Sequence, residues 1–324
     1  MKILIVGAGA VGTVYGRHLV LGGADVSFYV REKYLQDLLA SSKQGLLFYL
    51  WNKKNKAGPE QVLWKGFGVL SRLKEVEQEQ WDAVILSTSS TGLRGEWLEP
   101  FLKAIGNAST LVTLQPGLHD REYLTTRFPV DRLVEGSIPI VSYFAPMEDE
   151  RLDKPGVAVW LPPGAKVFLS GNETRVRPLL ELFNRGGLRA SLDQGAKKKE
   201  VVPGTVLSLF IAALKASGWS FQSLQKGPEL RLACQAMHEI IPVLAKNEGI
   251  SVSRSLLKLL LTPGFFKALL WVSRFLVPFD FERYLKLHFT KVGEQMAQNR
   301  RDMIEVAQKA QVTTPALLKL NQVS

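Results

Sequence analysis

Six residues near the amino terminus have the types and spacing of a dinucleotide site: Gly7-Ala8-Gly9-Ala10-Val11-Gly12. In such a G-x-G-x-x-G pattern the first glycine permits a tight turn, and the second lets the backbone approach a pyrophosphate. The third lets a helix pack closely on the preceding strand, so that the amides opening the helix point at the phosphates. The pattern predicts that all six residues contact a bound dinucleotide.

A basic residue stands where the sequence would distinguish the two nicotinamide dinucleotides. Arg31 follows the second predicted strand, and Lys33 is two residues further on. An NAD site usually places Asp or Glu here to bond the ribose hydroxyls, whereas arginine attracts a 2′-phosphate. We therefore expect NADP(H). The alternative is that Arg31 is a surface residue and that Glu32 binds the ribose.

These residues need a strand, a helix and a second strand to position them. Residues 1–6 are an apolar run typical of a buried parallel strand, and the pattern that leads to residues 22–23 is helical. Residues 25–30 predict the second strand. Because the glycine motif sits in this strand, turn, helix, strand order, it is much more specific than the motif alone.

Two later strands end in polar residues at the edge where the glycine turn lies. Strands are predicted at residues 81–86 and 110–115. Ligands of open α/β sheets bind at the carboxyl ends of the strands, which makes the residues there candidates for the cofactor site. These candidates are Ser87, Thr88, Ser89, Gln115 and Pro116. The hydroxyls of residues 87–90 would equally suit a solvated turn or the cap of the next helix.

The remaining strand signals extend the first part of the chain. Residues 45–73 indicate an irregular hairpin around a polar loop at 51–56, and residues 133–142 are expected to continue the sheet. Residues 156–161 and 166–169 predict a hairpin around a Pro-Pro-Gly turn.

Beyond the basic triplet at 197–199 the sequence changes to long helical patterns. The best of them cover residues 206–216, residues 229–247 with an interruption at Pro242, and residues 282–310. We therefore predict an α/β protein of two domains. Residues 1–194 would form a Rossmann-type parallel sheet domain that binds NADP(H), and residues 195–324 an all-helical domain for substrate binding and dimerisation.

Composition is that of an ordinary globular protein, with 46% hydrophobic and 22% charged residues. The formal net charge is +11, and residues 195–324 hold 18 Lys and Arg against 9 Asp and Glu. This excess suits an anionic substrate, an acidic partner, a membrane surface or a generally basic solvated surface. No nucleic-acid motif or stacking aromatic array accompanies it, so we expect no nucleic-acid partner.

The chain has one cysteine, Cys234, which excludes an internal disulfide. It lies in an apolar helical pattern, and a buried structural thiol fits this setting better than a nucleophile. Met1 leads directly into the first strand, and no apolar run reaches about 18 residues. We therefore expect a cytoplasmic protein without a targeting or transmembrane segment.

A strongly apolar stretch at residues 255–289 is interrupted by cations. It could line a pocket for a bulky anionic substrate, or make peripheral contact with a membrane surface. The plainer alternative is that it forms the buried faces of core or dimer helices whose cations extend outward. A homodimer is our expectation.

Taken together, the order of these parts resembles the ketopantoate reductase family. The likeness rests on the Rossmann domain that begins at residue 1, Arg31, the Gln115-Pro116-Gly117 turn, a late hairpin and a helical second half ending in Thr314-Pro315. The resemblance implies that NADPH reduces a 2-oxo acid while a lysine at the start of the helical domain donates a proton to the carbonyl oxygen. The matching segment begins at Lys199, which is our candidate catalytic residue. Lys197 and Lys198 leave the register open, and a solvated linker charge is the alternative.

Several positions depart from the family's pattern. Pro203 and Leu207 stand where the family has asparagines after the lysine, and Pro116 replaces the asparagine of its Q-N-G turn. Ser89 replaces a lysine, and Gln295 falls at an expected substrate contact. We therefore expect a divergent oxidoreductase whose substrate is bulkier and more apolar than ketopantoate. The alternative is an NADP(H)-binding sensor without catalysis.

Overall fold

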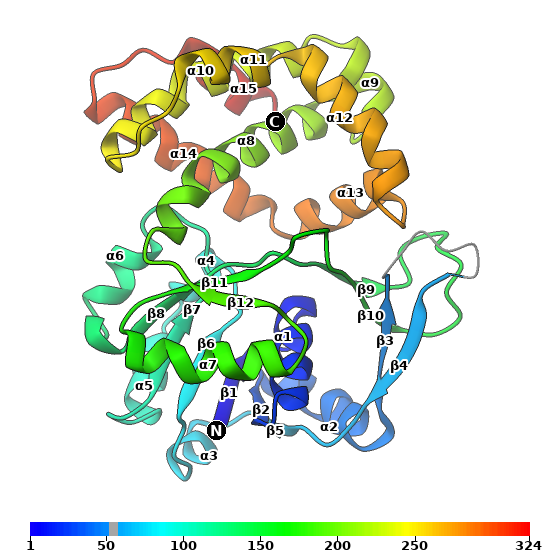
Figure 1. Ribbon diagram of the computed structural model, residues 1–324, viewed down its shortest axis with the longest axis vertical. Helices are drawn as coiled ribbons and strands as arrows, with labels where there is room; N and C mark the ends of the chain where they lie inside the picture. The colour runs from blue at the N-terminus through cyan, green and yellow to red at the C-terminus, as the bar shows by residue number, and fades with distance from the viewer. Residues whose placement is uncertain (52–57) are drawn as a thin grey trace. The chain divides into compact units, whose positions relative to one another are not determined.

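The computed structural model describes residues 1–51 and 58–324 and divides into two compact units, Met1–Lys197 and Lys198–Ser324 (Figure 1). The first unit is built on an eight-stranded sheet in which neighbouring strands are parallel, except that β11 runs antiparallel to β8. In order across the sheet, the strands are β12 (Ala190–Leu192), β11 (Val167–Ser170), β8 (Leu133–Gly136), β7 (Thr110–Thr113), β6 (Ala83–Leu86), β1 (Lys2–Val6), β2 (Asp25–Tyr29) and β5 (Gly68–Leu70). The predicted α/β class is confirmed.

The central strands are mostly apolar because both faces of the sheet are covered. Ile3 and Ile5 of β1 pack in one core with α1 (Ala10–Leu21) and α7 (Glu173–Arg185), whereas Leu4 and Val6 pack in a second core with α5 (Leu98–Ala104). The chain passes from β1 to β2 on one side, and β6 then pairs with β1 on the other side. The strand order thus reverses between β1 and β6, where open α/β sheets bind ligands.

Shorter helices connect these strands. They are η1 (Glu32–Tyr34), α2 (Leu35–Gln44), α3 (Leu73–Glu77), α4 (Ser90–Leu93), α6 (Asp120–Thr125) and η2 (Val130–Arg132).

A second sheet of four strands belongs to the same unit (Figure 1). Its strands are, in order, β4 (Glu60–Trp64), β3 (Leu46–Leu50), β10 (Gly156–Trp160) and β9 (Val141–Ala145). The antiparallel pairing of β3 with β4 confirms the hairpin predicted within residues 45–73. Of its predicted polar loop, residues 52–56 lie outside the described residues.

One strand prediction is wrong and another holds only in part, because β9, β10 and β11 pair with other strands than predicted. β10 pairs with β3 and β9, while β11 pairs with β8 and β12, so residues 156–169 form no hairpin. Of residues 133–142, β8 continues the main sheet as predicted, whereas β9 lies in the small sheet. Gly156 lets β10 approach β3 closely, since a Cβ at this position would stand 2.6 Å from the carbonyl oxygen of Leu47 in β3. A close approach between segments far apart in the sequence leaves no signal in the residues around Gly156 from which the pairing could be predicted.

The second unit contains helices and no strand among its described residues, as predicted. Its helices are α8 (Ala196–Ala216), which starts in the last two residues of the first unit, α9 (Phe221–Lys226), α10 (Glu229–Asn247), α11 (Arg254–Leu260), α12 (Pro263–Leu276), α13 (Phe281–Lys291), α14 (Gly293–Lys309) and α15 (Pro315–Val323). α8 begins ten residues before the predicted start, and Pro203 lies inside it. Cys234 is buried in α10, and burial raises the pKa of its thiol to about 11, which fits the predicted structural role.

Two helix predictions also need correction. α10 runs through Pro242 without a break, because Ile240, Ile241 and Leu244 around the proline are fully buried. Burial of each of these side chains stabilises the fold by about 1.5–3 kcal/mol. Their sum exceeds the roughly 3 kcal/mol by which a proline destabilises the interior of a helix. The helix predicted over residues 282–310 is two helices, α13 and α14, separated at Val292 before the poor helix former Gly293.

Candidate cofactor site

The glycine turn joins β1 to α1 at the point where the strand order reverses. Gly7 has a φ of +94°, which favours glycine, and its amide donates to the carbonyl oxygen of Tyr29 at 2.9 Å. Gly9 is the N-cap of α1 and provides no side-chain cap. Helix geometry leaves the amides of the first turn without intrahelical acceptors, and a helix end of this kind attracts anions.

The glycines of the turn meet different surroundings. A Cβ on Gly12 would lie 2.5 Å from the carbonyl oxygen of Gly7 and 2.6 Å from Oγ of Ser87. A Cβ on Gly9 would meet no atom within 4 Å. Gly12 is therefore required by packing, whereas Gly9 borders open space with room for a phosphate group. These residues fit the pyrophosphate of a dinucleotide.

The hydroxyls after β6 mainly support the backbone of the site. Oγ of Ser87 donates toward the carbonyl oxygens of Val6 and Gly7, at 2.9 and 2.8 Å, and so holds the glycine turn against β6. Oγ of Ser89 accepts from the amide of Gly92 at 3.0 Å and caps α4. For Ser89 the helix-cap alternative from the sequence is confirmed.

Gln115 joins the ends of β6 and β7. Its buried amide nitrogen donates to the carbonyl oxygens of Thr88 and Leu86, at 2.9 and 3.2 Å. The backbone carbonyl oxygen of Gln115 accepts from Nζ of Lys197 at 3.2 Å. The neighbouring Pro116 is exposed and has no amide hydrogen. The structure thus brings Thr88, Gln115 and Lys197 together at one edge of the sheet.

The two candidate lysines fall in different units. Lys197 is the last residue of the first unit and is half-buried, whereas Lys199 is exposed and belongs to the second unit. Of the basic triplet, Lys197 is the lysine that lies in the first unit, where it contacts the turn at Gln115.

A buried carboxylate that the sequence analysis missed fixes the turn after Gln115. Asp120 accepts from the amide of Gly117 at 2.8 Å, from Oγ of Ser90 at 2.6 Å and from the guanidinium of Arg94 at 2.6 Å. Its side chain is almost fully buried. An aspartate near a glycine turn was the available signal, since such residues often accept backbone hydrogen bonds in turns.

Basic side chains gather at the carboxyl ends of β2 and β5. Because these strands are parallel neighbours and Val30 donates to the carbonyl oxygen of Leu70 at 2.9 Å, Arg31 and Arg72 extend from the same edge. Glu32 accepts from the hydroxyl of Ser71 and lies 3.9 Å from the Arg72 guanidinium. Arg72 was missed because its strand was assigned to the hairpin excursion and not to the main sheet.

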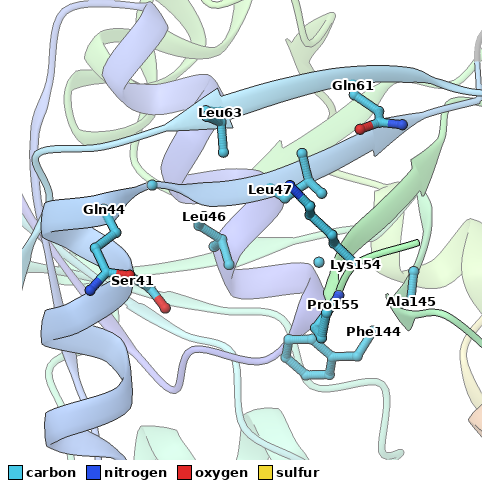
Figure 2. A pocket seen from close by; sticks show the side chains of 12 residues that line it. Ser41, Gln44, Leu46, Leu47, Gln61, Leu63, Phe144, Ala145, Lys154 and Pro155 are labelled. Carbon is cyan, nitrogen blue, oxygen red and sulfur yellow. The ribbon is translucent and has the colours of Figure 1, made fainter. Parts of the chain in front are cut away.

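A hollow of about 780 Å³ lies against the small sheet (Figure 2). Its lining includes Leu46, Leu47 and Leu63 of the hairpin, with Phe144 and Lys154 facing them. Among the described residues that line it there is no acid, histidine or cysteine, and none belongs to the glycine-turn site. Because none of its lining residues belongs to the glycine-turn site, we do not assign the chemistry to it.

Comparison with known proteins supports the predicted resemblance. Residues 3–147 match the family model described as Ketopantoate reductase PanE/ApbA. A curated relative from Bacillus subtilis, named uncharacterized oxidoreductase YkpB, is 29% identical over 136 residues, which are 42% of this chain and 40% of the relative. The match therefore spans about two fifths of that relative's length.

Solved structures resemble the chain over its whole length. A 2-dehydropantoate 2-reductase from Geobacter metallireducens is 18% identical, with a TM-score of 0.66 and coverage of 100% of this chain and 98% of the other. A ketopantoate reductase of the PanE/ApbA family from Ralstonia eutropha is 18% identical, with a TM-score of 0.67 and coverage of 100% of this chain and 97% of the other. D-mandelate dehydrogenase with NADH and anilino(oxo)acetate is 17% identical, with a TM-score of 0.67 and coverage of 100% and 96%. At these identities the likeness establishes the fold.

Proposed function

We propose that this chain, whose residues 3–147 match the family model of ketopantoate reductases, is an NADP(H)-dependent oxidoreductase. Its substrate is a 2-oxo acid or related carbonyl compound that is bulkier and more apolar than ketopantoate. The observation that carries the proposal is the uncapped start of α1 beside open space at Gly9, at the reversal of strand order. That arrangement suits the pyrophosphate of a nicotinamide dinucleotide.

The preference for NADP(H) rests on charge at the end of β2. Arg31, Lys33 and Arg72 are exposed there. Two carboxylates lie nearby: Glu32 accepts from the hydroxyl of Ser71 and lies 3.9 Å from Arg72, and Glu75 accepts from the amides of Ser71 and Arg72. A 2′-phosphate would gain charge-assisted hydrogen bonds, each worth about 1.5–3 kcal/mol. D-mandelate dehydrogenase binds NADH on a similar fold, so the fold alone does not select the cofactor.

The chain's own residues bind and orient the reactants. A bound nicotinamide cofactor supplies the hydride. The amides of Ala10, Val11 and Gly12 bind the pyrophosphate, while Ser87 and Gln115 keep the ends of β1, β6 and β7 in fixed register. A lysine ammonium at the start of α8 then donates a proton to the carbonyl oxygen, on which negative charge develops.

Two lysines compete for this role. Lys199 matches the family's segment, whereas Lys197 has its ammonium 3.2 Å from the carbonyl oxygen of Gln115, at the carboxyl edge of the sheet. Lys198 is exposed and provides a matched control in the same triplet.

The substrate class follows from the missing polar groups. Pro116 offers neither a side-chain amide nor a backbone donor, and Ser89 is occupied as a helix cap. A small hydroxylated acid would lose contacts at both positions. The anilino(oxo)acetate bound to D-mandelate dehydrogenase joins an oxoacetate to an aromatic anilino group, which supports a larger apolar substituent here.

The experiment that tests the function measures NADPH oxidation with 2-oxo acids of increasing size and apolarity. We expect turnover that rises with the apolar side chain. Substituting the proton donor by alanine should lower kcat about 10²- to 10⁴-fold without changing the affinity for NADPH. Lys197→Ala and Lys199→Ala are compared with Lys198→Ala, which should keep the activity. Full activity in all three variants would remove the lysines from the mechanism.

A non-catalytic sensor is the second candidate, and Pro116 and Pro203 in place of asparagines favour it. It would bind NADPH, seen as a change in tryptophan fluorescence, yet never oxidise it with any member of the substrate panel.

A further inference from the structure

Helices α11 and α12 of the second unit expose large apolar side chains. Leu259 is 69% exposed, Trp271 60% and Phe275 61%, and Leu256 and Leu276 are exposed as well. Trp271 and Phe275 contact each other edge to face, with ring centroids 5.0 Å apart. A concentration of exposed apolar side chains of this kind marks an interaction surface.

α12 has two apolar faces where a helix packed on a single core needs only one. Phe266 and Leu270 are buried, and the Phe266 ring stacks on Phe210 of α8 with centroids 5.6 Å apart. At 3.6 residues per turn, Val272 and Phe275 lie on the opposite side. The inner face already anchors the helix in the unit, which leaves the outer face without a role in this packing.

The charged residues within the stretch that forms α11 and α12 all have one sign. Residues 249–279 contain no Asp or Glu but include Arg254, Lys258, Lys267 and Arg274, all exposed. Lys267 and Arg274 are seven residues apart, so they lie on one side of α12 and flank its outer apolar face. The surface thus combines apolar side chains with a cationic border.

We propose that α11 and α12 bind the surface of an anionic lipid bilayer. The helices lie along the interface, the apolar side chains enter the region between headgroups and acyl chains, and the four cations contact lipid phosphates. In the described residues no single helix is long and apolar enough to cross a bilayer, although α11 and α12 together meet the length and composition criteria with a bend of 57°. The 14 residues of α12 rise only about 21 Å, less than the roughly 30 Å hydrocarbon core.

Charge also favours lipid over a second copy of this chain. A twofold contact through this surface would place the same patch on both copies. Arg254, Lys258 and Lys267 of one copy would then face the same cations of the other copy, and residues 249–279 hold no Asp or Glu. Like charges opposed in this way disfavour association, whereas lipid phosphates neutralise them.

The test is flotation of the full chain with vesicles of phosphatidylcholine alone or mixed with phosphatidylglycerol. We expect association with the anionic vesicles that weakens at high salt. Lys267→Gln/Arg274→Gln should lower the vesicle partition roughly 10- to 30-fold, since each cation near the surface contributes a factor of about five. Trp271→Ser/Phe275→Ser should abolish it.

The matched control is Leu318→Ser, which replaces a side chain of α15 that is 44% exposed in the same unit. It should bind vesicles like the unaltered protein, and circular dichroism with thermal melting checks that every variant is folded. Absence of binding to anionic vesicles by the unaltered protein would overturn the proposal, as would full binding by Trp271→Ser/Phe275→Ser. A dimer in ultracentrifugation that this double variant dissociates, without vesicle binding, would assign the surface to a second copy instead.

Discussion

Gly9 and Gly12 separate the packing role of the glycine turn from its binding role. For Gly12→Ala we expect a loss of about 1–3 kcal/mol in the free energy of unfolding, because the new Cβ would lie 2.5 Å from the carbonyl oxygen of Gly7. For Gly9→Ala the space is open, so stability should stay within about 0.5 kcal/mol while NADPH affinity falls about tenfold or more. Urea unfolding and NADPH titration of both variants measure the two effects. Full NADPH affinity in folded Gly9→Ala would show that no phosphate passes over this residue.

Arg31 carries the predicted choice of cofactor. Removing its guanidinium should lower the affinity for NADPH about 10- to 100-fold and leave that for NADH nearly unchanged, because only the 2′-phosphate loses a partner. Arg72→Ala should have a smaller effect in the same direction. Lys43→Ala removes an exposed cation of α2 and serves as the control. An equal loss for both cofactors in Arg31→Ala would place this residue elsewhere in the site.

At the scale of elements, the close packing of α1 against α7 makes stability depend on pH. Nδ1 of His18 in α1 lies 2.7 Å from the carbonyl oxygen of Gly186, at the end of α7. Burial lowers the pKa of His18 below 6.5, the hydrogen bond to Gly186 opposes this effect, and Arg17 adds to it. The unfolded chain therefore binds a proton at this residue at a higher pH than the folded chain does.

Stability should consequently decrease as the pH falls below about 6.5, by at most about 1.4 kcal/mol per pH unit from this group. Urea unfolding between pH 5 and pH 7.5 measures it, with His18→Asn for comparison. The asparagine amide can still donate to Gly186 but does not titrate. Parallel pH profiles of the two proteins would show that His18 contributes nothing to this dependence.

The elements predicted correctly are those specified by neighbouring residues. The apolar run of β1, the glycines after it and the periodicity of α1 are local, and together they give the site its core. The partner of a strand is not local, which explains why β10 and β11 were joined in a hairpin and why Arg72, at the end of β5, was not placed beside Arg31. Asp120 has one local partner, the amide of Gly117, but its partners Ser90 and Arg94 lie about 30 residues earlier in the chain and are not local.

At the scale of the whole molecule, positive charge on the protein favours both proposed ligands, the dinucleotide and the lipid surface, because both carry phosphate groups. The net charge of +11 and the cations at Arg31, Lys33 and Arg72 favour a dinucleotide with an extra phosphate. The cations of α11 and α12 favour a surface rich in phosphate groups by the same attraction. Both contacts should therefore weaken as the salt concentration rises.

Calorimetric titration of the purified full chain with NADPH and with NADH tests the central claim most directly. We predict one bound dinucleotide per chain, with NADPH bound about tenfold or more tightly than NADH. Failure of both dinucleotides to bind the folded protein would contradict the assignment of the glycine turn as a pyrophosphate site.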